Sequence, residues 1–218
     1  MMTATIATPI SEIELIPGSA IQINGLSWER YLNLLEQFGD HRSTRLMYDN
    51  GALEIRMPGQ HHEAINRVLS AIVLTLADEL GLELNDLGSM TMNRPALRQG
   101  IEPDSCFYIQ NAQAGQGWIS VMGDELPPDL ALEVDIASQS DRKLSLYEAM
   151  EVPELWVYRR ETVSIRWLVM GTYQEKTMSR SFPLVSAVQL SQWIELRKTG
   201  TDLTVVRAVR SFCRELRV

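Results

Sequence analysis

Cysteine is nearly absent from this sequence, which holds only Cys106 and Cys213 among its 218 residues. Two cysteines this far apart match neither a disulfide framework nor the paired spacing of a structural zinc site. We therefore expect both thiols to be unbridged, Cys106 in a core strand and Cys213 on the last helix, in a reducing compartment. The N-terminus also lacks a basic segment followed by an apolar one, so a cytoplasmic location is expected.

Positive charge is scarce as well. Twenty Lys and Arg residues stand against twenty-eight Asp and Glu residues, which gives a formal net charge of -8. Residues 1–110 hold seven basic and fourteen acidic residues, and residues 111–218 hold thirteen and fourteen, so any basic surface must come from the second half. A protein that binds nucleic acid through a broad basic face usually has the opposite balance.

Long apolar runs and the common nucleotide-binding motifs are also missing. The most apolar helical stretch, residues 71–80, is interrupted by Thr75, Asp78 and Glu79, so no membrane span is expected. The sequence has no phosphate-binding loop, no GxGxxG after a strand and no GxSxG, which argues against nucleotide-dependent and serine-hydrolase chemistry. A content of 45% hydrophobic and 22% charged residues instead indicates a globular protein.

The alternation of helix and strand patterns predicts a single α/β domain, a mixed sheet flanked by helices, over residues 27–218. Residues 1–26 form a loose lead-in in this interpretation. A long helix is expected over residues 61–80, with one apolar stripe and Gly81 as its end. Strands are expected at residues 82–84, 90–92, 102–108, 129–136 and 155–158, hairpins at 45–57 and 163–177, and shorter helices at 27–39, 141–150 and 202–216.

Two acidic residues lie at strand positions where burial of a charged carboxylate costs free energy. Asp104 begins a strand, and Glu133 lies inside the apolar strand that starts near residue 129. Because strand side chains alternate between two faces, Glu133 and Asp135 are expected on the same face as Ala131. Carboxylates that point together repel each other unless a cation or a proton intervenes. An alternative stays open, in which Asp135 lies in solvent and Glu133 pairs with an arginine.

Two further sets of residues are candidates for chemistry at the acids. Lys143 lies on the helix after Glu133, with Tyr147 four residues later on the same helical face. A lysine there can orient a water or stabilise a phosphate, although a solvated helix lysine is the simpler alternative. At the start of the long helix, His62 lies near the inward stripe and Glu63 points nearly opposite to it. Capping and solvation are the simpler alternative for this pair.

The ordered series Pro103-Asp104, Glu133 and Lys143 resembles the PD-(D/E)XK nuclease superfamily. More closely, the chain resembles the bacterial Uma-type family, whose members are described as restriction endonucleases. The resemblance covers about residues 25–215 and rests on residues 59–63, 102–108, 128–134, 143–147 and 152–156. It implies a restriction-endonuclease-like fold and the hydrolysis of DNA phosphodiester bonds by a homodimer.

The resemblance also implies roles for individual residues. Asp104 and Glu133 would bind Mg²⁺ or another divalent cation such as Mn²⁺, with the Val134 carbonyl as a third ligand. His62, in preference to Glu63, would be the contribution of the helix, and Lys143 would orient the attacking water or offset developing charge. The chain departs from the superfamily pattern in one place, because the lysine that follows the second acid by two residues is here an aspartate, at position 135.

Three readings of the function remain at this point. A metal-dependent endonuclease is favoured by the intact acids and lysine, a catalytically silent binding or scaffold module by the acidic net charge, and a hydrolase of smaller phosphate esters fits the same residues. For the acids we expect that crowding of Asp104 against Glu133 raises the pKa of at least one carboxyl group. Removing either acid should then leave the fold intact or slightly more stable.

Overall fold

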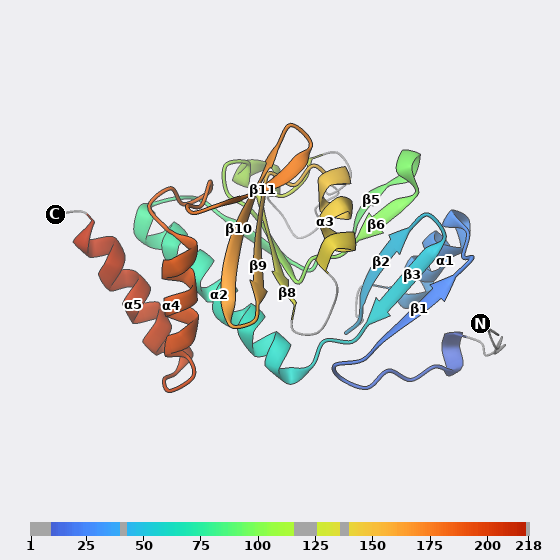
Figure 1. Cartoon of the computed structure of the whole chain (residues 1–218), viewed down its shortest axis with the longest axis horizontal. Helices are drawn as coiled ribbons and strands as arrows, with labels where there is room; N and C mark the ends of the chain where they lie inside the picture. Colours follow the sequence, from blue (N-terminus) through green and yellow to red (C-terminus); the bar gives the residue numbers. More distant parts are fainter. Residues whose placement is uncertain (1–9, 40–42, 116–125, 136–139, 217–218) are drawn as a thin grey trace.

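The computed structural model describes the chain except residues 1–9, 40–42, 116–125, 136–139 and 217–218. The described residues form two β-sheets and five α-helices (Figure 1), which confirms the mixed α/β class. Ile136, the last residue of the strand predicted at 129–136, lies outside the described residues.

Among the described residues, the first sheet is antiparallel throughout. The second is antiparallel except for one parallel pair, β8 with β9. The five-stranded sheet has the order β1-β3-β2-β6-β5, and the six-stranded sheet the order β11-β10-β9-β8-β7-β4. The strands of the first are β1 (Ala20–Asn24), β2 (Arg45–Asp49), β3 (Ala52–Arg56), β5 (Met92–Arg94) and β6 (Gln99–Ile101). Those of the second are β4 (Asn85–Gly88), β7 (Ser105–Tyr108), β8 (Leu130–Val134), β9 (Glu154–Arg159), β10 (Thr162–Val169) and β11 (Thr172–Lys176).

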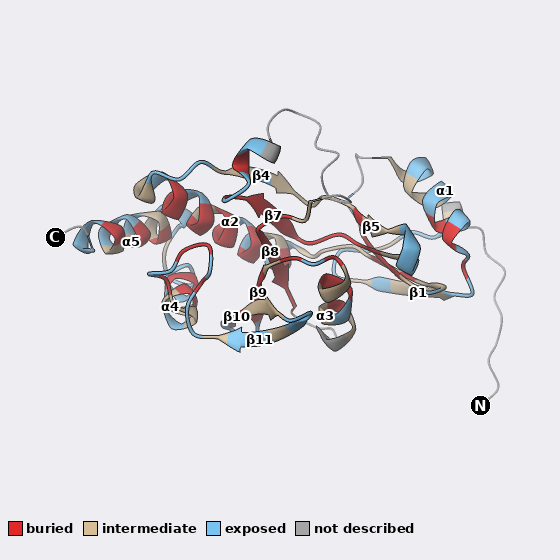
Figure 2. Ribbon diagram, turned by 90° about the horizontal axis from the view of Figure 1, so that it is seen from above, coloured by how far each residue is buried: buried red, intermediate tan, exposed pale blue. Residues whose placement is uncertain are grey.

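The apolar core of the described residues consists of three layers. Figure 2 shows buried ribbon along the central strands and α2. Helix α2 (Gln60–Leu80) lies on one face of the six-stranded sheet and is covered by α4 (Ala187–Leu196) and α5 (Asp202–Glu215). Helix α3 (Ser140–Ala149) packs between the other face of that sheet and the five-stranded sheet. Helix α1 (Trp28–Phe38) covers the far side of the five-stranded sheet.

The expected long helix is present as α2, and its apolar stripe faces the sheet. Val68 and Ile72 belong to the same buried core layer as Leu132 of β8. Gly81 ends the helix in the left-handed conformation, with φ at 68°, because a residue without Cβ adopts it without strain. In the described part of the chain, no helix combines the length and the apolar character needed to cross a membrane.

Four details of the sequence interpretation are wrong. The loose lead-in is not irregular throughout, since residues 20–24 form β1, whose alternating residues pair with β3. Helix α4 was not expected, and the strands placed at 82–84 and 90–92 lie instead at 85–88 and 92–94. The strand expected over 102–108 is present only as β7 at 105–108, and Glu102 pairs instead with Leu46 in the other sheet. The bounds of a strand depend on the strands that it pairs with, and those partners come from distant parts of the sequence.

Both cysteines are buried and unbridged, which confirms the prediction made for them. Cys106 lies in β7 and Cys213 in α5. Burial raises the pKa of the Cys106 thiol to about 12, so almost none of it is thiolate at neutral pH. We expect iodoacetamide to label neither thiol in the native protein and both after unfolding, as measured by mass spectrometry. Native labelling at the rate of a free cysteine would contradict the buried placement.

Candidate functional site

The site lies where the chain passes from one sheet to the other. The Glu102 backbone N–H donates to the carbonyl of Leu46 in β2, at 3.1 Å. Two residues later the Asp104 N–H donates to the carbonyl of Leu132 in β8, also at 3.1 Å. Pro103 stands between them and has no N–H to pair, so it suits the one position that belongs to neither ladder. This crossing places Asp104 at the boundary between the two sheets.

The Asp104 carboxylate is buried, with 1% of the residue exposed. Its Oδ2 accepts a hydrogen bond from the Val134 backbone N–H at 2.7 Å and lies 3.0 Å from His62 Nε2. Its Oδ1 is buried without a hydrogen-bond donor among the described residues. The Asn66 side-chain amide donates to the Asp104 backbone carbonyl at 3.1 Å, which ties the residue to α2. One carboxylate oxygen is therefore fixed in place while the other has acceptor capacity left.

Glu133 is held by α3. The alternation along β8 places Glu133 on the face of Ala131, toward the layer that contains α3. The Lys143 ammonium donates to Glu133 Oε2 at 2.6 Å, and the Tyr147 hydroxyl donates to Oε1 at 2.5 Å. Lys143 is only 6% exposed, so it is not the solvated helix lysine that the sequence left open.

Tyr147 supports Glu133 rather than Lys143. Burial, together with the nearby charge of Glu133, raises the pKa of the Tyr147 hydroxyl well above its ordinary value. The hydroxyl therefore stays protonated and donates its hydrogen to the carboxylate.

Arg56, which the sequence interpretation missed, stands between the two acids. One guanidinium nitrogen, Nη2, lies 3.7 Å from Asp104 Oδ1 and 3.7 Å from Glu133 Oε2. The sequence of β3 alternates between apolar and charged residues, which indicated this position. Its apolar residues Leu53 and Ile55 are buried in the layer of α1. Their neighbours at 54 and 56 are charged and share the opposite face. The structure thus brings Asp104 and Glu133 to a common cation, but that cation is an arginine.

The expected rise in carboxyl pKa from crowding is wrong for Asp104. Burial alone would raise the pKa of this carboxyl group. The contact with His62 and the charges of Lys143 and Arg56 outweigh burial and lower the pKa to about 2. Crowding between the two acids is outweighed by positive side chains from β3 and α3 and by the contact with His62 of α2.

Two other acids considered from the sequence lie outside this group. Asp135 follows β8 and is 2% exposed, and its Oδ2 lies 3.9 Å from Arg159 Nε. The alternative that placed Asp135 in solvent is therefore wrong on that point. Its other half, in which Glu133 pairs with an arginine, is confirmed by Arg56. The Glu63 side chain is 36% exposed and lies 3.9 Å from Arg45. His62, by contrast, contacts Asp104, with Nε2 lying 3.0 Å from Oδ2.

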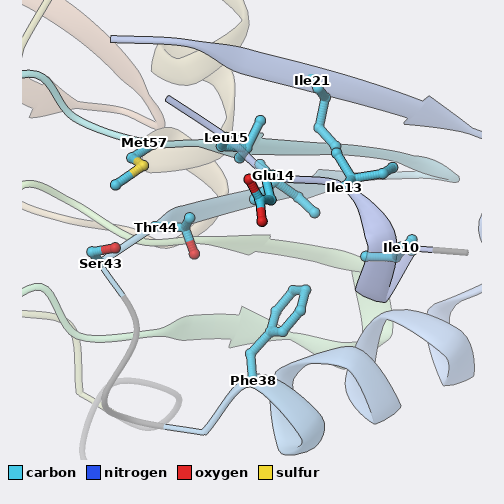
Figure 3. A pocket seen from close by; sticks show the side chains of 10 residues that line it. Ile10, Ile13, Glu14, Leu15, Ile21, Phe38, Ser43, Thr44 and Met57 are labelled. Atoms are coloured by element: carbon cyan, nitrogen blue, oxygen red, sulfur yellow. The ribbon is translucent and has the colours of Figure 1, made fainter. Parts of the chain in front are cut away.

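Among the cavities of the described residues, two of several hundred cubic ångströms border the five-stranded sheet. One, of about 370 Å³, lies beside the carboxylates and is lined by Arg56, His62 and Val134 together with Glu54, residues 57–59, His61, Gly18 and Ala20. The other, of about 480 Å³, contains none of the candidate site residues. Figure 3 shows that it is formed mainly by apolar side chains such as Ile13, Ile21 and Phe38. The first cavity reaches the site through Arg56, His62 and Val134, each of which contacts Asp104.

The donor atoms at the junction fit a hard divalent cation. Within the described ranges, no three His, Cys, Asp or Glu side chains gather as a ready metal cage. Mg²⁺, however, is commonly held by one or two carboxylates and completes its shell with water and substrate phosphate. Asp104 Oδ1 is a buried carboxylate oxygen without a hydrogen bond, and the Glu133 carboxylate lies across Arg56 from it. Asp104 and Glu133 are therefore the residues that would hold such an ion.

Comparisons with known proteins place the chain in a family. Among curated proteins, no sequence matches it. The family model Uma2, described as "Putative restriction endonuclease", matches residues 28–199, which include Asp104, Glu133 and Lys143. The match supports a nuclease type of function and, with the two sheets and flanking helices, confirms the restriction-endonuclease-like fold. Because the match spans most of its length, the chain belongs to the Uma2 family.

Proposed function

We propose that this protein is a Mg²⁺- or Mn²⁺-dependent endonuclease that hydrolyses DNA phosphodiester bonds. The observation that carries the proposal is the buried pair Asp104 and Glu133, with the Lys143 ammonium 2.6 Å from Glu133 and an open cavity alongside. Buried carboxylates are costly to keep, and here they meet at the junction of two sheets. A hydrolase that binds phosphate through a cation uses such a pair.

Each residue has a defined part in this proposal. Asp104 and Glu133, with the Val134 carbonyl, would hold the cation, which when bound polarises the scissile phosphate and lowers the pKa of a bound water. Lys143 supplies fixed positive charge at the edge of the site, where negative charge develops in the transition state. Tyr147 orients Glu133, and His62 orients Asp104 from the start of α2.

DNA as the substrate follows from the family, and the charge of the chain sets how it would bind. With a net charge of -8, the protein offers few phosphate contacts, so we expect weak affinity for duplex DNA that falls further as salt is added. A homodimer, which the resemblance implies, would double these contacts and stays a prediction.

The proposed function is tested with supercoiled plasmid and purified protein. We expect nicked and linear products with Mg²⁺ or Mn²⁺, and none with EDTA. Calorimetric titration of Mn²⁺ should give one site per chain in the wild type. In Glu133→Gln we expect both the binding heat and the cleavage to be lost, because the cation loses a charged ligand.

The controls separate the three readings of the function. Asp135→Asn changes a buried acid outside the group and should cleave as the wild type does. Binding of Mn²⁺ and DNA without any cleavage would favour the silent binding module. Metal-dependent hydrolysis of small phosphate esters, with plasmid left intact, would instead favour the smaller substrate.

A further inference from the structure

Arg56 occupies the place that a cation shared by the two acids would take. Its Nη2 lies 3.7 Å from an oxygen of Asp104 and 3.7 Å from an oxygen of Glu133. The oxygen on Asp104 is the one without a hydrogen bond, so it is also the one available to a metal ion. At 3.7 Å the guanidinium attracts both carboxylates without a close hydrogen bond to either. Such a contact offsets charge but is weaker than direct coordination.

The surroundings of Arg56 favour its charge and hold it at the acids. Burial works against the charge, but the carboxylates of Glu133, Asp104 and Glu54 together raise the pKa of the guanidinium. Across the five-stranded sheet, Arg56 stands directly opposite Arg45. Like charges at opposed positions are unfavourable unless acids compensate them. Arg45 is compensated separately, by Glu63 at 3.9 Å, and Arg56 by the two acids of the site.

We propose that Arg56 is the resident counter-ion of the metal-free site and that it leaves the carboxylate pair when a divalent cation binds. The protein would then keep Asp104 and Glu133 together without metal, and a metal ion would have to compete with the guanidinium. This inference rests on the proposed function, because it assumes that the two acids bind a metal. It adds that Arg56 sets how tightly they do so.

The structure has room for the exchange. Arg56 lines the cavity of about 370 Å³ beside the acids, so its long side chain can turn into that space while the backbone of β3 stays in place. Glu54 lies two residues earlier on the same face of β3 and lines the same cavity. A displaced guanidinium would therefore still have a carboxylate near it. In that position it would also face a phosphate group bound in the cavity.

The experiment compares wild type, Arg56→Gln and Arg45→Gln. Calorimetric titration with Mn²⁺ gives the affinity of each, and thermal unfolding in EDTA gives the stability without metal. For Arg56→Gln we expect Mn²⁺ to bind about tenfold more tightly, because no guanidinium competes, and the melting temperature in EDTA to fall. Saturating Mn²⁺ should then restore the melting temperature of Arg56→Gln more than it raises that of the wild type.

Arg45→Gln is the matched control, because it removes one positive charge at the opposed position of the neighbouring strand without touching either acid. It should change the Mn²⁺ affinity by less than about threefold. Equal affinity in all three proteins, or weaker binding in Arg56→Gln, overturns the role of Arg56 and leaves the proposed metal site standing. The absence of binding in every protein, including Arg56→Gln, overturns the proposed function along with this inference.

Discussion

In Asp104→Ala, we expect the rate of metal-dependent DNA cleavage to fall by about 10³-fold and the free energy of unfolding in metal-free buffer to fall by about 2–3 kcal/mol. The loss of rate follows from the loss of one of two charged ligands. The loss of stability follows because buried groups that contact the carboxylate lose their partner. The buried Val134 N–H loses its acceptor at 2.7 Å, and Arg56 and His62 lose their nearest shared acid.

Two variants separate these effects. Asp104→Asn keeps an oxygen for the Val134 N–H, so it should recover part of the stability but little of the rate. Asp129→Ala removes another buried aspartate, which accepts from the backbone of Ile109 and Asn111 away from the acids. It should lose stability and keep its rate per folded molecule. Denaturant titrations and plasmid cleavage at matched folded fractions measure both quantities. An Asp104→Ala protein as stable as the wild type would restore the expectation drawn from crowding alone.

In Lys143→Met, we expect a loss of about 3 kcal/mol in the free energy of unfolding and a loss of about 10²–10³-fold in the cleavage rate. Lys143 is 6% exposed and lies 2.6 Å from the Glu133 carboxylate, which is itself 2% exposed. Removing one partner of a buried pair leaves the other charge in a poor environment. Only the more distant guanidinium of Arg56 and the hydroxyl of Tyr147 would still face Glu133.

A double-mutant cycle with Glu133→Gln tests this account. Because glutamine is neutral, Lys143→Met should cost much less stability in the Glu133→Gln background than in the wild type. Lys198→Met is the matched control, since the Lys198 side chain is 45% exposed and pairs with exposed acids. It should change stability by less than about 0.5 kcal/mol. Equal costs for Lys143→Met in both backgrounds would show that the lysine acts through packing rather than through Glu133.

How much of the site the sequence could predict differs from residue to residue. Glu133 is conspicuous because a carboxylate interrupts a run of apolar strand residues, and Asp104 because it follows a proline at a strand start. Lys143 and His62 were open to simpler readings, since a lysine on a helix and a histidine at a helix start usually meet solvent. For Arg56 the sequence offered only a weak indication, the alternation of apolar and charged residues in a hairpin strand. Its importance comes from two acids that are 48 and 77 residues further along the chain.

The sequence by itself determined the elements whose signals are local. The periodicity of residues 61–80 and the glycine after them are enough for α2, and the Asn-Gly turn is enough for the β2–β3 hairpin. It also determined that both cysteines stay free, since nothing in their spacing suits a bridge or a metal. Such features depend on residues within a few positions of one another.

Only the tertiary structure decided where the charges meet. Glu102 pairs with β2 and Asp104 with β8, on either side of Pro103, so Asp104 lies at the boundary of the two sheets. There Arg56 of β3 lies 3.7 Å from both acids. The same packing lowers the pKa of Asp104 to about 2, whereas the sequence alone predicted that it would rise. Electrostatic interactions depend on distance and burial in space, and neither quantity can be read from the order of residues along the chain.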